Sequence, residues 1–243
     1  MNIHYLAALG AAVFAATLSG TSHAQDTAPL RTTGGPTDHS QFVGTFAIGF
    51  LGLRTLGIAS GDAGDPFDAV DVPVIGGRYW LDAGMGIDAG LGFRFGSGSN
   101  TNEVGGVSTD VDNPQPAAFI LHGGLPLALA DSRYFVFELV PELNIGFSGN
   151  TIEGGAGDVV FRGFHLDLGA RAGAEIHFGF IDIPQLSLQA GIGVALAYDR
   201  VSVEDEAANA SNSASTTNFG TNVGNNPWDI FAGNISALYY FGD

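Results

Sequence analysis

The sequence contains no cysteine and no lysine, and both absences exclude classes of protein. Without cysteine the chain has no disulfides, no thiol nucleophile, no cysteine-ligated zinc site and no iron–sulfur cluster. Only 8 basic residues, all arginine, stand against 25 acidic ones, and the formal charge of −17 argues against a nucleic-acid partner, because binding phosphates requires a basic patch. Beyond residue 24, no apolar run approaches the roughly 18 residues of a membrane-spanning helix.

The first 24 residues are typical of a secretory signal peptide. Residues 3–18 are almost entirely apolar, and Ser22-His23-Ala24 supplies small residues around a cleavage point. An uncleaved anchor helix is the alternative, but the apolar stretch is short for a span. We therefore predict cleavage after Ala24, followed by a polar, flexible leader over residues 25–41 and one folded domain over residues 42–243.

The folded domain shows apolar and polar residues in alternation, which indicates strands because successive side chains point to opposite faces. In residues 85–95, for example, Met85, Ile87 and Ala89 alternate with glycines and Asp88. We expect eight strands, many of them longer than those of soluble sheets. They cover residues 42–56, 70–81, 85–95, 116–129, 135–147, 164–177, 186–198 and 228–241. The alternation slips near Gly52, which predicts a β-bulge there.

The connections between these strands alternate in length. Residues 82–84, 130–133 and 178–184 form short turns, whereas longer polar segments occupy residues 57–69, 96–115, 148–158 and 200–227. Short connections at one end and long ones at the other describe an all-β fold, an eight-stranded antiparallel up-and-down barrel. The last long segment, rich in Asn, Ser, Thr and Ala, is expected to be a mobile loop.

Three features favour a transmembrane barrel whose apolar face is outside. The loop lengths are asymmetric, the polar face is spaced by glycine, and aromatic residues gather near the strand ends as in the two girdles of membrane barrels. The predicted girdle consists of Tyr79, Trp80, Phe93, Phe95, Tyr134, Phe135, Phe147, Phe164, Tyr198, Trp228, Tyr239, Tyr240 and Phe241. The reverse orientation would expose Asp167, Arg171 and Glu175 to lipid, and an arginine at the bilayer midplane costs roughly 2–4 kcal/mol.

The signal peptide, the eight alternating strands and the ending Tyr239-Tyr240-Phe241 resemble the small OmpA/OmpX-type outer-membrane β-barrel family of Gram-negative bacteria. Residues 77–81 followed by residues 84–93 are similar to a hairpin common in such barrels. The resemblance covers residues 42–241. It implies an outer-membrane location with a periplasmic leader, contact with lipid and lipopolysaccharide, and insertion by the barrel-insertion machinery, which reads the terminal aromatic residue.

In that orientation the polar side chains of the strands point into the lumen. They are Arg78, Asp88, Arg94, Glu138, Glu142, His165, Asp167, Arg171, Glu175, His177 and Gln189. An eight-stranded barrel is just wide enough for side chains to fill it, so we interpret these residues as a structural network of ion pairs. A narrow path biased toward cations is the alternative. Direct pairing of His165 with Asp167 is not expected, because neighbours on one strand face lie roughly 7 Å apart.

No catalytic constellation is visible, and we expect a non-enzymatic protein without cofactor or metal. Enzymes of the outer membrane include lipid A deacylases with a His-x-Ser arrangement, but the adjacent His39-Ser40 lies before the first strand. The sequence favours a structural or surface-interaction protein whose external loops meet a partner of unknown kind. Three alternatives remain open, namely a narrow pore for small solutes or ions, a lipid A-modifying enzyme and a soluble lipocalin-like binder.

Overall fold

The computed structural model describes residues 36–58, 68–96, 99–104, 107–112, 117–153, 157–221 and 235–242. The predicted signal peptide, leader residues 25–35 and Trp228 therefore lie outside the described residues. Among the described residues, no helix is both long enough and apolar enough to cross a membrane.

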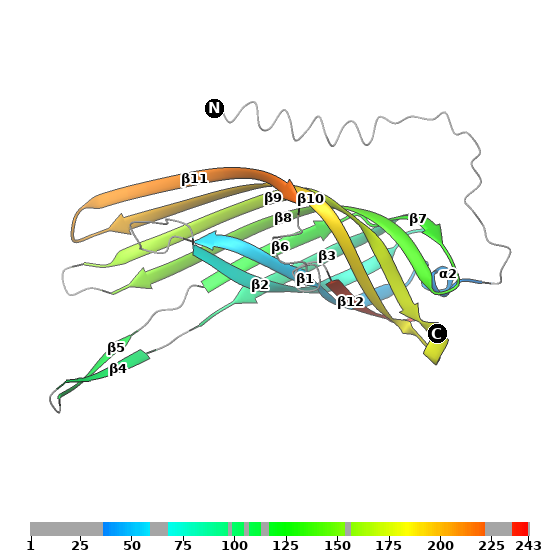
Figure 1. Cartoon of the computed structure of the whole chain (residues 1–243), viewed down its shortest axis with the longest axis horizontal. Helices are drawn as coiled ribbons and strands as arrows, with labels where there is room; N and C mark the ends of the chain where they lie inside the picture. Colours follow the sequence, from blue (N-terminus) through cyan, green and yellow to red (C-terminus); the bar gives the residue numbers. More distant parts are fainter. Residues whose placement is uncertain are drawn as a thin grey trace. The chain divides into compact units, whose positions relative to one another are not determined.

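Within the described residues, eight antiparallel strands close into a barrel (Figure 1). In spatial order they are β1 (Phe46–Ile58), β2 (Asp68–Trp80), β3 (Gly86–Arg94), β6 (Ala117–Gly124), β8 (Phe135–Ile152), β9 (Val159–Phe178), β10 (Ile183–Asp205) and β12 (Ile235–Tyr240). Consecutive strands pair with each other, and β12 pairs with β1 to close the circle. The predicted all-β, eight-stranded antiparallel up-and-down barrel is confirmed.

Four further strands extend this framework. β7 (Leu127–Asp131) pairs with the start of β8, β11 (Ala210–Thr221) pairs with the far half of β10, and β4 (Ser99–Val104) pairs with β5 (Val107–Asp112) in a separate hairpin. The segment 200–221 was predicted as a loop, but β10 and β11 form a regular hairpin there. The two strands pair without interruption, from the pair Val194 and Thr221 to the pair Asp205 and Ala210.

The two ends of the barrel differ, as predicted. Short connections at residues 81–85, 132–134 and 179–182 define what we call the turn end, and the 3-10 helix η1 (Gly179–Ile181) lies in the last of them. The opposite end, which we call the loop end, carries the β10–β11 hairpin and the long ends of β8 and β9 (Figure 1).

The predicted bulge in β1 is confirmed at Gly52. The register with β2 shifts between Phe50 and Gly52, and Gly52 has a φ of +114°, a backbone conformation that favours glycine. The extra residue changes which side chains face inward, from Leu51 before the bulge to Arg54 and Leu56 after it.

After this bulge, the end of β1 reaches the opposite wall of the barrel. The Ser148 hydroxyl of β8 donates to the carbonyl of Gly57 at 3.3 Å. Leu56 fills the space that a side chain at Gly146 would need. The end of β1 therefore narrows the interior at the loop end.

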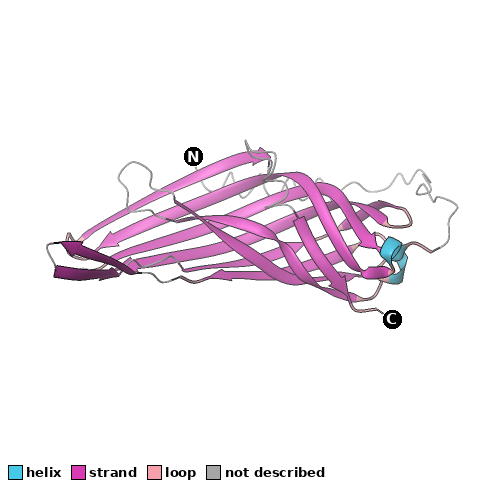
Figure 2. Ribbon diagram, turned by 60° about the horizontal axis from the view of Figure 1, so that its bottom comes forward, coloured by secondary structure: helices cyan, strands magenta, loops and turns pink. Residues whose placement is uncertain are grey.

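A short helix, α2 (Asp38–Gln41), closes the turn end (Figure 2). Thr37 caps it by accepting a hydrogen bond from the Ser40 backbone N–H, and the Asp38 N–H donates to the Arg133 carbonyl of the β7–β8 turn. Asp38 and His39 are buried. The prediction of a flexible leader is therefore wrong for residues 38–41, because tertiary contacts hold a segment whose composition alone suggests flexibility.

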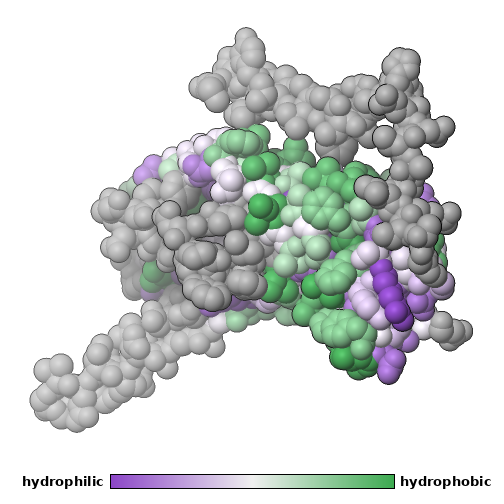
Figure 3. All heavy atoms as spheres, turned by 45° about the vertical axis from the view of Figure 1, so that its right-hand side comes forward, coloured by the Kyte–Doolittle hydropathy of each residue, from purple (hydrophilic) through white to green (hydrophobic). Residues whose placement is uncertain are grey.

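The outer wall is apolar, and the inner wall is divided. Exposed Phe, Leu, Ile and Val side chains gather over the middle of the face shown in Figure 3, with hydrophilic residues on either side. Inside, β8 and β9 contribute most of the charged residues, joined by Arg54 of β1 and Arg78 of β2. The strands β1, β2 and β6 also contribute an aliphatic cluster that includes Leu51, Leu56, Val72, Val74 and Ile120. This explains why the alternation in those three strands is irregular, since both of their faces carry apolar residues.

Candidate functional site

The barrel interior is the candidate site, because it contains most of the buried charged groups among the described residues. β9 positions one key residue at each of three levels, His165 nearest the loop end, then Arg171, then Glu175 nearest the turn end. Their spacing by even numbers keeps all three on the inward face. Each is the centre or edge of a polar cluster that draws residues from neighbouring strands.

The deepest cluster surrounds Arg78, which has no exposed surface. Its Nε and Nη2 donate to the two oxygens of Asp88 at 2.7 and 2.8 Å. Nη1 donates to Glu175 at 2.8 Å and to both oxygens of Glu138 at 3.2 Å, and Nη2 also donates to Gln189 Oε1 at 3.0 Å. All of the guanidinium N–H groups therefore have acceptors, and the arginine ties β2 to four other strands, β3, β8, β9 and β10, at one point.

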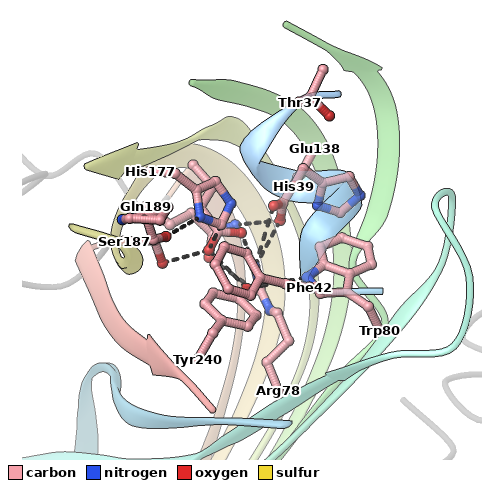
Figure 4. Close-up of polar contacts among 12 residues, drawn as sticks. Thr37, His39, Phe42, Arg78, Trp80, Glu138, His177, Ser187, Gln189 and Tyr240 are labelled. Carbon is pink, nitrogen blue, oxygen red and sulfur yellow. Dashed lines mark hydrogen bonds and ion pairs between the residues drawn. The ribbon is translucent and has the colours of Figure 1, made fainter. Parts of the chain in front are cut away.

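A chain of hydrogen bonds connects this cluster to the turn end (Figure 4). Trp80 Nε1 donates to the Tyr240 hydroxyl at 3.1 Å, and that hydroxyl donates to Glu175 Oε1 at 2.8 Å. Ser187 donates to the same carboxylate oxygen at 2.5 Å. Trp80 and Tyr240 are thus interior residues.

The girdle prediction is wrong for these two residues. Tyr79 and Tyr239 are exposed, and adjacent residues of a strand face opposite sides, so Trp80 and Tyr240 point inward. The other predicted girdle residues that the structure describes are exposed or partly exposed, namely Tyr79, Phe93, Phe95, Tyr134, Phe135, Phe147, Phe164, Tyr198, Tyr239 and Phe241.

The middle cluster contains two arginines and one carboxylate. Glu142 Oε2 accepts from Arg54 Nη2 at 3.0 Å and lies 3.1 Å from Arg171 Nε. Asn144 Oδ1 accepts from Arg54 Nε at 3.3 Å and lies 2.7 Å from His122 Nδ1. This cluster has two arginines for one carboxylate, whereas the Arg78 cluster has one arginine for three carboxyl groups. Positive groups are therefore in excess at the middle level, and acidic groups are in excess at the level around Arg78.

The third cluster places His165 between two carboxylates. Its Nδ1 lies 2.7 Å from Asp199 Oδ1, and its Nε2 lies 3.0 Å from Asp167 Oδ2. The prediction that His165 and Asp167 do not pair is wrong, because side chains on one strand face lean along the strand toward each other. Both ring nitrogens contact carboxylates, so this histidine has no nitrogen left to activate a nucleophile.

Aromatic rings and histidines fill the turn end beneath the Arg78 cluster. His39 of α2 packs edge-on against Trp80 with ring centroids 4.5 Å apart, and Phe42 stacks on His177 and Tyr240 at 5.3 and 4.7 Å. His39 Nε2 lies 3.0 Å from the Ala83 carbonyl. This contact requires a proton on Nε2, and it anchors α2 to the β2–β3 turn.

Burial lowers the pKa of His39 below its ordinary value of 6.5, although the hydrogen bond to Ala83 and the charges of Glu175 and Asp131 act in the opposite direction. A detached His39 takes up a proton near its ordinary pKa, whereas the docked one takes up a proton only at a lower pH. The docking of α2 is therefore complete above about pH 6.5 and weakens as the pH falls below it.

We accordingly expect the amides of residues 37–42 to exchange faster at about pH 5.5 than at about pH 7.5 after correction for intrinsic rates. His39→Gln keeps a side-chain N–H donor but does not titrate, so its exchange should not depend on pH. An equal pH dependence in this variant would assign the effect to other ionisable groups in or near α2, among them Asp38, His177, Glu175 and Asp131.

The structure gathers nearly all predicted lumen residues in the interior. Arg78, Asp88, Glu138, His165, Arg171, Glu175, His177 and Gln189 are buried, and Glu142 and Asp167 are partly buried. The prediction is wrong for Arg94, which ends β3 at the loop end, is exposed, and donates to the Asp71 carbonyl at 3.2 Å.

Sequence reasoning missed several members of these clusters, namely Arg54, His122, Asn144, Ser187, Asp199, Ser236 and Tyr240. The slip at Gly52 was the signal for Arg54, because a one-residue bulge reverses the inward and outward positions that follow it. Asn144 lies on the same face of β8 as Glu138 and Glu142, so the alternation of that strand already indicates its inward position.

In chemical terms, the described interior contains networks of paired ions. In the part of the chain that the structure describes, no group of three or more His, Asp or Glu side chains is placed to hold a metal ion. The sequence matches no protein-family model and no curated protein.

Proposed function

We propose that this protein is a non-enzymatic outer-membrane β-barrel of the OmpA/OmpX type, with a structural or surface-interaction role. The observation that carries the proposal is the division of polarity in a closed barrel, with apolar side chains outside and ion pairs inside. A soluble barrel would place its ion pairs in water and its phenylalanines in the core. Exposed Phe93, Phe137 and Ile192 fit a lipid environment instead.

The dimensions of the apolar belt support a membrane location. Outward-facing apolar residues run from Phe135 to Phe147 on β8, from Phe164 to Ile176 on β9, and from Leu186 to Tyr198 on β10. At a rise of about 3.3 Å per residue and a tilt of about 45°, about 13 residues cover about 30 Å. This equals the thickness of the hydrocarbon core of a bilayer.

The loop end supports the surface-interaction role. β8, β9, β10 and β11 continue as a four-stranded sheet beyond the belt. Among the described residues, β11 pairs only with β10, and residues 210–220 contain no charge and no proline that would protect the other edge of the strand. An unprotected strand edge binds extended segments through its backbone, and an extended segment of a surface protein is the kind of partner this edge fits.

The filled interior argues against the narrow pore. The aromatic residues and α2 at the turn end, the three polar clusters, and the end of β1 at the loop end occupy successive levels of the barrel. In planar bilayers we expect no steady discrete conductance above that of protein-free membranes. Openings that Glu138→Gln abolishes would favour a pore and contradict the structural role.

Fractionation tests the proposed location, together with heat-modifiable migration in gels. The protein should remain with the outer membrane until detergent is added, and the unheated protein should migrate faster than the heated one. Recovery in the aqueous periplasmic fraction would favour a soluble binder.

Mass spectra of lipid A from cells with and without the protein test the non-enzymatic role, and a difference in acyl chains would contradict it.

A further inference from the structure

Two exposed arginines lie immediately beyond the apolar belt at the loop end. Arg162 is the first outward-facing residue past Phe164 on β9, and Arg200 is the first past Tyr198 on β10. In the register, Arg162 lies opposite Ser202 and Arg200 lies opposite Phe164, so the two arginines are diagonal neighbours on one face. Side chains in this relation lie about 7–8 Å apart at their origins, within reach of a single ligand group.

The surroundings of this arginine pair are hydroxyl groups on one side and aromatic rings on the other. Ser215 lies opposite Arg200, and Ser213 lies opposite Ser202, on the exposed outer face of β11. On the belt side, Phe164 packs against Phe147 and Tyr198 with ring centroids 5.5 and 6.3 Å apart. The arginines and serines therefore lie just outside the apolar belt, and the aromatic rings lie at its edge.

The charge at this position is unusual for the chain. Arg162 forms an ion pair with Glu204 at 2.6 Å, and both side chains are about half exposed. Arg200 is exposed and has no ion-pair partner among the described residues. The arginine pair with Glu204 thus keeps one positive charge, on a chain whose formal charge is −17.

We propose that Arg162 and Arg200, with Ser202, Ser213 and Ser215, bind the phosphate of an anionic glycolipid headgroup in the outer leaflet. The inference rests on the proposed membrane location. Arginine is suited to this ligand because its planar guanidinium donates two parallel hydrogen bonds to phosphate oxygens. The serine hydroxyls supply further donors for phosphate and sugar oxygens, and the aromatic rings below them fix the site at headgroup height.

The test compares binding of phosphorylated lipid A and dephosphorylated lipid A to the detergent-purified full chain by native mass spectrometry. We expect the double variant Arg162→Gln/Arg200→Gln to bind the phosphorylated lipid about tenfold more weakly. Arg133→Gln, which removes an exposed arginine at the turn end, is the matched control and should bind normally. The parent, the double variant and the control should all bind dephosphorylated lipid A equally.

Two outcomes would overturn the proposal. Equal binding of the phosphorylated lipid by the double variant and the parent would remove the arginines from the site. Complete competition by inorganic phosphate would make this a site for free anions rather than for a lipid headgroup. Refolding into phosphatidylcholine vesicles is measured separately. If the protein inserts but shows no preference for phosphorylated lipid A, only the headgroup site is contradicted. If the protein does not insert, the proposed function is contradicted.

Discussion

Replacing Arg78 with glutamine is expected to lower the free energy of unfolding by about 3–5 kcal/mol, the range for breaking a buried ion pair by removing one partner. The arginine has no exposed surface and its donors reach Asp88, Glu138 and Glu175. Its removal leaves three buried carboxyl groups that repel each other and lose the donors that the guanidinium supplied. Urea unfolding of the protein refolded in detergent micelles, followed by tryptophan fluorescence, measures the change.

Two further variants make this prediction specific. Arg94→Gln removes an exposed arginine of the neighbouring strand and should change the stability by no more than about 0.5 kcal/mol. Adding Asp88→Asn and Glu175→Gln to Arg78→Gln removes two of the three unpaired carboxylates and should restore part of the loss. If Arg78→Gln unfolds at the same urea concentration as the parent, the arginine does not hold the strands together.

The second large effect concerns the outer wall. Ile192 lies midway along the apolar span of β10, faces outward, and is 56% exposed. In a bilayer, Ile192→Arg is expected to cost about 2–4 kcal/mol of stability, because the guanidinium is held at the membrane midplane. Unfolding in phosphatidylcholine vesicles measures this cost.

Ser211→Arg is the matched control, because Ser211 is exposed on β11 opposite Glu204, beyond the belt, where an added charge meets water. The control should retain the parent's stability. Equal stability of both variants would mean that the belt does not face lipid.

The strand pattern could be predicted because the period of two is a direct consequence of backbone geometry. It gave the strand number, the antiparallel order and the inward position of Glu138, Arg171 and Glu175. The prediction from this pattern failed where one extra residue exchanges the inward and outward positions that follow it. The bulge at Gly52 hid Arg54, and counting both Tyr79 and Trp80 as girdle residues contradicted the alternation itself.

Other features depend on contacts that no local pattern encodes. The helix α2 forms in a polar segment because Asp38 and His39 find partners in the β7–β8 and β2–β3 turns. The pairing of His165 with Asp199 joins residues of two strands whose register the sequence does not specify. Composition likewise suggested a loop at residues 200–221, where a long hairpin satisfies the backbone instead.

The orientation of the barrel wall toward lipid can be measured directly with single cysteines, since the natural sequence has none. A fluorophore on Ile192→Cys and one on Ser215→Cys are compared in vesicles that contain either nitroxide-labelled lipid or a water-soluble quencher. We predict that the lipid quencher affects residue 192 and that the aqueous quencher affects residue 215. Quenching of residue 192 from the aqueous phase would contradict a membrane-embedded wall.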